Sequence, residues 1–183
     1  MRPNPELFYI PYERFVADVE TLARRLEGET WRPDFLVGVG RGGLVPAAYL
    51  SHRLDVPLLS VDHSSGDAAF ADELLAKLAA KSRAGTHILI IDDINDTGST
   101  IAYLKQAIGS QGGVEDRVRV GVLVNNVRSK ARADYSAREI DRETDKRWFV
   151  FPWEAMASPA ALRGEARRGD GGAGTARLKD AGQ

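Results

Sequence analysis

The chain has 183 residues, of which 43% are hydrophobic and 28% charged, and its formal net charge is −1 at pH 7. This composition fits one globular domain with a substantial core, and the near-neutral charge gives no electrostatic indication of nucleic-acid binding. The absence of cysteine excludes disulfides and thiolate metal sites. The N-terminus lacks the pattern of a signal peptide and no apolar run is long enough to span a membrane, so we expect a cytoplasmic protein without a membrane partner.

The first predicted element is a helix over 12–26, where apolar residues recur at helical spacing and Gly28 is the expected stop. A strand over 35–39 comes next and ends in the glycine-rich turn Gly40-Arg41-Gly42-Gly43. The remaining predicted elements are, in chain order, a helix over 44–54, a strand over 57–61, a helix over 73–81, a strand over 88–91, a helix over 99–108 and a strand over 118–124. Apolar strands that alternate with helices are typical of an α/β fold with a parallel sheet covered on both faces.

Two stretches depart from this alternation. Residues 62–73 are small and polar without clear periodicity, which is typical of a lid or a disordered loop. Residues 161–183 are rich in glycine and have little to bury, so we predict a disordered tail. The sequence therefore predicts a single domain over residues 1–160.

Residues 88–100, ILIIDDINDTGST, combine features that suit a sugar phosphate. Four apolar residues predict a buried strand that delivers Asp92 and Asp93 to the carboxyl edge of the sheet, where open α/β folds bind ligands. Their carboxylates can accept hydrogen bonds from sugar hydroxyls, directly or around a Mg²⁺ ion. The following residues, Asp96, Thr97, Gly98, Ser99 and Thr100, form the turn into a helix, and backbone N–H groups at a helix N-terminus bind anions. Alone, each of these residues would indicate a helix cap or a solvated loop, but their combination favours a ligand site.

This segment resembles the signature of type I phosphoribosyltransferases throughout, and the resemblance extends over about residues 8–158. It implies a parallel twisted sheet flanked by helices, with a small hood lobe formed by the N-terminal segment and about residues 125–158. In this family the acidic pair contacts the ribose hydroxyls and the Asp-Thr-Gly-Ser-Thr loop holds the 5-phosphate. The resemblance makes Asp96 a candidate proton acceptor, and it makes Asp92 and Asp93 the candidate Mg²⁺ ligands.

The glycine-rich turn resembles the pyrophosphate loop of the same family, with Gly40, Arg41 and Gly42 as the binding residues and a strained or cis peptide expected before Arg41. On its own, this turn would more simply be a tight strand-to-helix connection. Residues 62–73 stand where the family has its mobile catalytic loop, in which His63, Ser64 and Ser65 are candidates, although a loop without a role fits equally.

The segment from Trp148 to Glu154 resembles the base-binding segment of 6-oxopurine phosphoribosyltransferases, particularly the short xanthine–guanine type. The resemblance implies base-binding roles for Trp148, Phe149 and Glu154, whereas the packing of a small lobe is the simpler explanation for Phe151 and Trp153. Where these enzymes have a lysine that donates to the purine 6-oxo group, this chain has Asn126. An asparagine amide can donate to a carbonyl without bringing charge, and Arg128 or Lys130 are alternative donors.

The sequence thus predicts an enzyme that transfers a phosphoribosyl group from phosphoribosyl pyrophosphate to a nitrogenous base, with Mg²⁺ as cofactor and pyrophosphate as product. The expected acceptor is a 6-oxopurine such as guanine, xanthine or hypoxanthine, and the expected assembly is a homo-oligomer. Two alternatives stay open: a non-catalytic regulatory protein that binds phosphoribosyl pyrophosphate, and a transferase for another base.

Overall fold

The computed structural model describes residues 5–61 and 68–169. Its centre is a five-stranded sheet in the order β3-β2-β4-β5-β6, and every neighbouring pair is parallel. The strands are β2 (Phe35–Val39), β3 (Leu58–Val61), β4 (Ile88–Asn95), β5 (Val118–Asn126) and β6 (Tyr135–Ile140). The predicted parallel α/β sheet is therefore confirmed.

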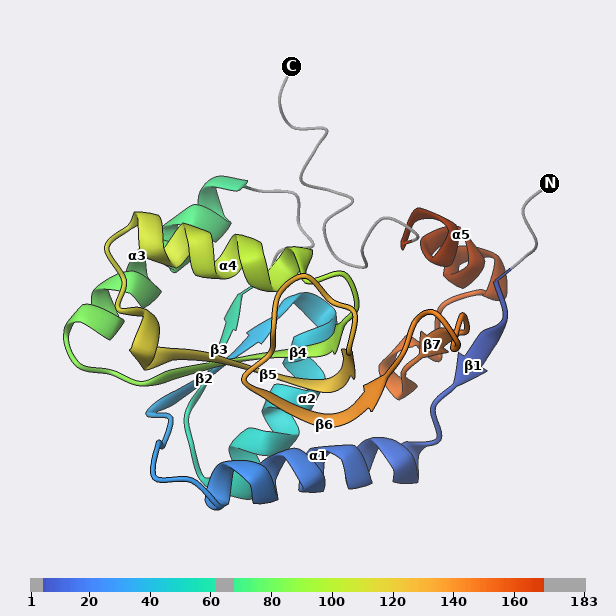
Figure 1. The fold of residues 1–183 in the computed structure, drawn as a ribbon, viewed down its shortest axis with the longest axis horizontal. Helices are drawn as coiled ribbons and strands as arrows, with labels where there is room; N and C mark the ends of the chain where they lie inside the picture. The colour runs from blue at the N-terminus through green and yellow to red at the C-terminus, as the bar shows by residue number, and fades with distance from the viewer. Residues whose placement is uncertain (1–4, 62–67, 170–183) are drawn as a thin grey trace.

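Helices cover both faces of this sheet (Figure 1). The helices are α1 (Tyr12–Glu27), α2 (Gly40–Leu54), α3 (Ala68–Arg83) and α4 (Ser99–Ser110), with a 3₁₀ turn η1 (Glu115–Arg117) before β5. One core cluster joins α1 and α2 to the sheet, and a second joins α3 and α4 to the opposite face. Strand β4 contributes side chains to both clusters, because successive side chains of a strand point to opposite faces. Leu89 and Ile91 belong to the first cluster, and Ile88 and Ile90 belong to the second.

A two-stranded parallel sheet lies beside the central one. It pairs β1 (Leu7–Tyr9) with β7 (Trp148–Val150), and the 3₁₀ turn η2 (Pro152–Glu154) follows β7. The edge-to-face contact of Phe8 with Phe149 helps to hold the two strands together. The chain thus brings its N-terminal segment and residues 148–150 together, as the predicted hood requires.

The connection from β5 to β6 is unusually short for parallel neighbours, which generally need a dozen or more residues and a helix. Residues 127–134 contain no helix, and they return along the α4 side of the sheet, where Ala131 and Ala133 pack in the second core cluster. We call this segment the return segment. It lies directly against the turn that precedes α4.

Three sequence predictions are corrected. Helix α2 begins at Gly40, so the glycine-rich turn is the first turn of that helix instead of a loop before it. Helix α3 begins at Ala68, so residues 68–73 are helical, while His63, Ser64 and Ser65 lie outside the described residues.

The third correction concerns the predicted tail. Helix α5 (Pro159–Gly169) occupies its first part, and Leu162 and Ala166 on that helix are buried. Their spacing of four residues gives a short apolar stripe that composition alone conceals.

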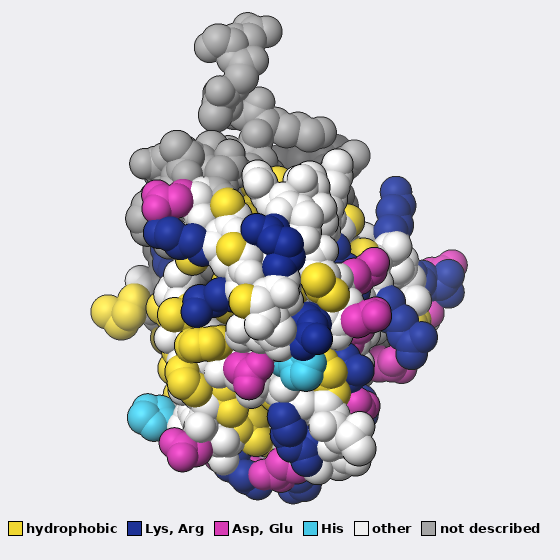
Figure 2. Space-filling model, turned by 90° about the vertical axis from the view of Figure 1, so that its left-hand side faces the viewer, with side chains coloured by type: hydrophobic (Ala, Val, Ile, Leu, Met, Phe, Trp, Pro, Cys, Tyr) yellow, Lys and Arg dark blue, Asp and Glu magenta, His cyan; other side chains and the backbone are white. Residues whose placement is uncertain are grey.

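No helix in the described ranges is long and apolar enough to cross a membrane. Figure 2 views the end of the molecule that lies at the left in Figure 1, which is the end where the strands of the central sheet begin. On this face, lysine and arginine side chains are interspersed with aspartate and glutamate.

Candidate functional site

The candidate site lies where β4 ends and α4 begins. The strand continues to Asn95, four residues beyond the predicted end, so Asp92 and Asp93 belong to the strand itself. Since successive side chains of a strand point to opposite faces, the two carboxylates lie on opposite faces of the sheet. Asp92 shares its face with Ile88 and Ile90, toward α4, and Asp93 shares its face with Leu89 and Ile91, toward α2.

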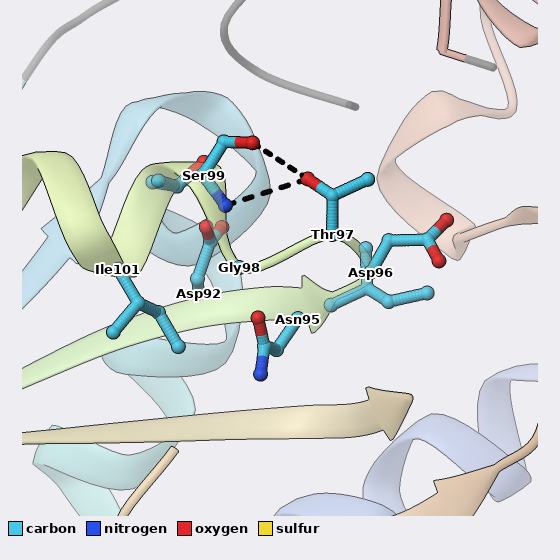
Figure 3. A pocket seen from close by; sticks show the side chains of 9 residues that line it. Asp92, Asn95, Asp96, Thr97, Gly98, Ser99 and Ile101 are labelled. Atoms are coloured by element: carbon cyan, nitrogen blue, oxygen red, sulfur yellow. Dashed lines mark hydrogen bonds between the residues drawn. The ribbon is translucent and has the colours of Figure 1, made fainter. Parts of the chain in front are cut away.

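Asp92 lines a pocket together with residues 94–101. In Figure 3 its carboxylate points toward the backbone nitrogen of Ser99, at the start of α4. Burial raises the pKa of Asp92 to about 7, and the hydrogen bond that it accepts from the Asp93 N–H (3.0 Å) opposes that shift. A partly buried carboxylate of this kind is stabilised by a ligand that donates hydrogen bonds or carries positive charge.

Asp93 faces the first turn of α2. A Cβ atom at Gly42 would lie 2.5 Å from the Asp93 Oδ2, so this position admits only glycine as long as the carboxylate stays in place. The pKa of Asp93 is raised well above its ordinary value by burial, and then by the charges of Asp92 and Glu154. The acidic pair and the glycine turn therefore meet, as a single ligand-binding site requires.

The glycine turn approaches β4 closely at Gly42 and Gly43. A Cβ atom at Gly43 would lie 2.0 Å from the carbonyl oxygen of Ile91, and Gly40 has φ +54, in the left-handed region. The peptide bonds of the described residues are all trans, so the cis peptide considered before Arg41 is not present, and glycine adopts the positive φ of Gly40 readily. The Arg41 side chain is exposed.

Glu154 interacts electrostatically with Asp93 and Arg41. Its Oε2 accepts a hydrogen bond from the Phe151 N–H (2.8 Å), which fixes its orientation on η2. Burial raises the pKa of Glu154, whereas the Phe151 N–H and the charge of Arg41 oppose the shift. Its electrostatic neighbours, Arg41 and Asp93, are thus residues predicted for pyrophosphate and ribose.

The turn into α4 is shaped for close approach. Gly98 has φ +87, and a Cβ atom there would lie 2.4 Å from the backbone nitrogen of Ala131 in the return segment. The Thr97 and Ser99 hydroxyls are hydrogen-bonded to each other (2.8 Å), and the Ser99 N–H reaches the Thr97 Oγ1 at 3.4 Å (Figure 3). These hydroxyls and the first N–H groups of α4 are of the kind that can bind an anion.

The return segment holds this turn from behind. The Lys130 N–H donates to the Thr97 carbonyl oxygen (3.1 Å), and the Asn95 Nδ2 donates to the Ala131 carbonyl oxygen (2.8 Å). The Ser129 hydroxyl in turn donates to the Asn95 Oδ1 (2.9 Å). The geometry of this turn is therefore imposed by the β5–β6 connection as well as by the helix.

Asp96 lies at the opposite end of the pocket from the Thr97 and Ser99 hydroxyls. Figure 3 shows its carboxylate directed away from them. Its Oδ1 accepts a hydrogen bond from the Arg142 Nε (3.0 Å), and the two side chains are each 18% exposed. The Arg142 Nη1 also donates to the carbonyl oxygen of Arg147 (2.6 Å), next to Trp148. This arginine, which the sequence analysis missed, ties the Asp96 loop to β7.

The model of the phosphoribosyl transferase domain matches residues 11–157. This chain belongs to the phosphoribosyltransferase family. The predicted enzyme class is thereby confirmed, and the fold agrees with that of the family's solved members.

Relatives of this phosphoribosyltransferase include purine enzymes. The chain is 27% identical to a xanthine-guanine phosphoribosyltransferase from Cereibacter sphaeroides over 161 residues, which cover 83% of this chain and 89% of the relative. A purine phosphoribosyltransferase from Pyrococcus horikoshii superposes with a TM-score of 0.58 at 24% identity, over 80% of this chain and 93% of the other. A hypothetical protein from Neisseria gonorrhoeae, solved with bound ppGpp, superposes with a TM-score of 0.64 at 18% identity, over 92% and 99% of the two chains.

Within this phosphoribosyltransferase, Asn126 does not occupy the position of a free base donor. It is 6% exposed, its Nδ2 donates to the Asp96 carbonyl oxygen (2.8 Å), and its Oδ1 accepts from the N–H groups of Arg128 and Arg142 (both 3.2 Å). Its amide therefore shapes the Asp96 loop. The Arg128 guanidinium, one of the alternative donors, pairs instead with Asp141 and Glu143 at the surface.

The two residues of the predicted base wall differ: Trp148 offers its side chain, and Phe149 offers only its backbone. Phe149 is 5% exposed and packs in the first core cluster, so its ring is not free to contact a base. The Trp148 N–H donates to the Glu6 carbonyl oxygen, and the Val150 carbonyl oxygen accepts from the Ile10 N–H. Trp148 and Val150 thus direct their peptide groups toward β1. Because alternate residues of a strand direct their peptide groups to opposite sides, the N–H and C=O of Phe149 point away from β1. Trp148 is partly exposed.

Proposed function

We propose that this phosphoribosyltransferase transfers the phosphoribosyl group of phosphoribosyl pyrophosphate to a 6-oxopurine and releases pyrophosphate. The observation that carries the proposal is the meeting of three elements at the end of β4: the partly buried carboxyl of Asp92, the hydroxyl-lined turn into α4, and the first turn of α2 against Asp93. The name of the Cereibacter relative supports a purine as acceptor.

The substrate is bound in three parts. The 5-phosphate binds at the N-terminus of α4, where the Thr97, Ser99 and Thr100 hydroxyls and backbone N–H groups meet its charge. Asp92 and Asp93 accept hydrogen bonds from the ribose hydroxyls. The pyrophosphate lies along the first turn of α2, where Gly42 leaves space and Arg41 supplies positive charge.

In the reaction, a ring nitrogen of the base forms a bond to C1 of the sugar while the bond from C1 to the pyrophosphate oxygen breaks. The base gives up a proton from its imidazole ring, and we assign Asp96 as the acceptor of that proton. The protein contributes mainly orientation and stabilisation of charge.

A Mg²⁺ ion fits this donor set in part. Asp92 and Asp93 supply carboxylate oxygens, but no group of three acidic or histidine ligands that could hold a metal occurs among the residues that the structure describes. Asp92 and Asp93 would hold such an ion together with water and substrate oxygens, and it would supply positive charge to the leaving pyrophosphate.

The test is pyrophosphate release from phosphoribosyl pyrophosphate with guanine, hypoxanthine, xanthine, adenine, uracil and orotate, each with and without Mg²⁺. We expect release with the 6-oxopurines, dependent on Mg²⁺. The double variant Asp92→Asn/Asp93→Asn should lose it, whereas Asp116→Asn, a change in η1, should retain it. Equal activity of the double variant and wild type would refute the site assignment.

A second candidate is nucleotide binding without transfer. The Neisseria protein solved with ppGpp aligns with 92% of this chain, and a phosphate-binding turn serves a bound nucleotide as well as a substrate. Calorimetric titration with phosphoribosyl pyrophosphate and with ppGpp distinguishes the two functions. Binding of either compound without pyrophosphate release from any of the six bases would favour this candidate.

A further inference from the structure

We propose that Arg142 is the specificity-determining residue of the base subsite, where it donates to a ring carbonyl of the acceptor and so selects oxo-bases over amino-bases. The inference rests on the proposed function, because it assigns the base end of the same pocket. It concerns a residue on the connection after β6 that no sequence motif indicated.

The first step is the position of Arg142. It pairs with Asp96, the pocket residue whose carboxylate points away from the phosphate-binding turn. A sugar phosphate whose phosphate lies at Thr97 and Ser99 extends toward Asp96, so the group attached at C1 lies near this pair. Arg142 also reaches the carbonyl oxygen of Arg147, directly before the partly exposed Trp148. The guanidinium therefore lies between the loop that holds the sugar phosphate and the strand that holds the base wall.

The second step is the donor capacity of Arg142. A guanidinium has five N–H donors and no acceptor. The Nε donates to Asp96, and the Nη1 donates to the carbonyl oxygens of Asp145 (3.3 Å) and Arg147 (2.6 Å). Within the described part of the chain these bonds account for three N–H groups, and the two on Nη2 remain for a ligand. The ring of Phe149 lies under the cation, 4.9 Å from the ring centroid, and fixes its plane.

The third step is the pairing of a donor with an acceptor. Arg142 offers N–H groups beside the carboxylate of Asp96, which only accepts when ionised. The complement of this pair is a base edge with a carbonyl oxygen beside a ring N–H. A 6-oxopurine presents a carbonyl there, whereas adenine presents an amino group that would meet the guanidinium donor to donor. Asn126 cannot take this role, because its amide is engaged with Asp96, Arg128 and Arg142.

The experiment compares Arg142→Gln and Arg142→Lys with a matched control, Arg138→Gln. Arg138 is also 18% exposed, also lies over the ring of Phe149 (5.2 Å), and also pairs with a buried carboxylate, but its partner is Asp18 on α1. Calorimetry measures the binding of guanosine and adenosine 5′-monophosphates to each protein, and pyrophosphate release is measured with guanine and adenine.

Wild type should bind the guanosine nucleotide more tightly than the adenosine nucleotide. Arg142→Gln should reduce that preference about 10-fold to 100-fold, the range for a lost hydrogen bond to a charged group. Arg142→Lys should restore part of it, and Arg138→Gln should leave it unchanged although it lowers thermal stability. Since both variants remove an arginine beside Phe149, a structural effect would not separate them.

If the nucleotides bind, two results would overturn the inference: wild type without preference between them, or an Arg142→Gln variant that keeps the preference. A failure of the proposed function looks different, since wild type would then release no pyrophosphate with any base while the nucleotide preference still tests Arg142. If neither nucleotide binds to wild type, Arg142 has no base to select and the inference is wrong.

Discussion

At the scale of single residues, Asp92 illustrates how a charged side chain in a candidate binding site can lower the stability of the folded protein. Its carboxyl is partly buried at the end of β4, and its pKa is raised to about 7 because the loss of surrounding water disfavours the charged form. In the unfolded chain the same group titrates near 4. The protonated form thus favours the folded state, and this contribution is lost as the pH rises from about 4 through 7.

Asp92→Asn should therefore stabilise the ligand-free protein above pH 7, by about 1 to 4 kcal/mol. The variant and wild type should have similar stability near pH 4, where both side chains are neutral. Denaturant unfolding between pH 4 and 8, in the presence of a chelator, measures the difference. Asp141, whose pKa is lowered chiefly by the Arg128 hydrogen bond, is the control: Asp141→Asn should remove a stabilising charge at neutral pH instead.

Glycine 43 gives a second prediction at this scale. Gly43→Ala would bring a Cβ atom to 2.0 Å from the Ile91 carbonyl oxygen, so α2 must move away from β4. We expect a loss of more than about 3 kcal/mol in the free energy of unfolding, comparable to overpacking of a core. Gly109→Ala in α4 is the control, because nothing lies within 4 Å of its Cβ position and alanine should stabilise the helix by up to about 1 kcal/mol. Equal effects of the two variants would contradict the close approach of α2 to β4.

The same residues mark the limit of prediction from sequence. The motif over 88–100 predicted a phosphoribosyl site because its chemistry is local: strand, acidic pair and turn are consecutive in the chain. Arg142 could not be found in this way, since it follows β6 and reaches Asp96 across 46 positions. The burial of Asn126 was equally hidden, because its hydrogen-bond partners are backbone groups of the Asp96, Arg128 and Arg142 segments.

At the scale of elements, α1 is fastened to the edge strand β6 by a buried ion pair. Asp18 is 4% exposed, and its Oδ2 accepts from the Arg138 Nε (2.9 Å), while Arg14 on the helix surface approaches its Oδ1 (3.2 Å). Removing one partner of such a pair leaves a buried charge, which generally costs more than the pair contributes.

Arg138→Met should lower the free energy of unfolding by about 2 to 4 kcal/mol. The double variant Asp18→Asn/Arg138→Met should recover part of this loss, because no buried charge is left without its partner. A double-mutant cycle by denaturant unfolding measures the coupling. Additive effects of the two changes would mean that the pair does not fasten α1 to β6.

The elements also show why strand prediction succeeded for some segments and missed others. The strand over 35–39 was predicted at its exact bounds, and β4 and β5 were found because they are continuous apolar runs. Strands β1 and β7 have three residues each, and β6 ends in Arg-Glu-Ile, so none carries a periodic signal of useful length. Their pairing is decided by contacts between the two ends of the chain.

At the scale of the whole molecule, α5 was mistaken for part of a tail because glycine and charge dominate its composition. Two buried residues, Leu162 and Ala166, nevertheless give it a face to pack. Composition averages over a segment, whereas a helix of three turns needs only a few apolar residues on one side.

Leu162→Ala should destabilise the protein by about 2 to 3 kcal/mol, the usual range for a leucine removed from a buried site. Arg163→Ala, an exposed neighbour on the same helix, should change stability by less than about 0.5 kcal/mol. Thermal unfolding compares them. If both variants unfold like wild type, α5 does not pack as the structure has it.

The short return segment between β5 and β6 has a consequence for the motions of the molecule. Eight residues span a distance that parallel neighbours usually cross with a helix, and their amides donate to Thr97 and Val120 carbonyls that belong to the phosphate turn and to the sheet. Opening this segment thus requires opening the sheet. Its amides at Lys130 and Asp134 should exchange with deuterium as slowly as those of β5, although in sequence the segment looks like a surface loop.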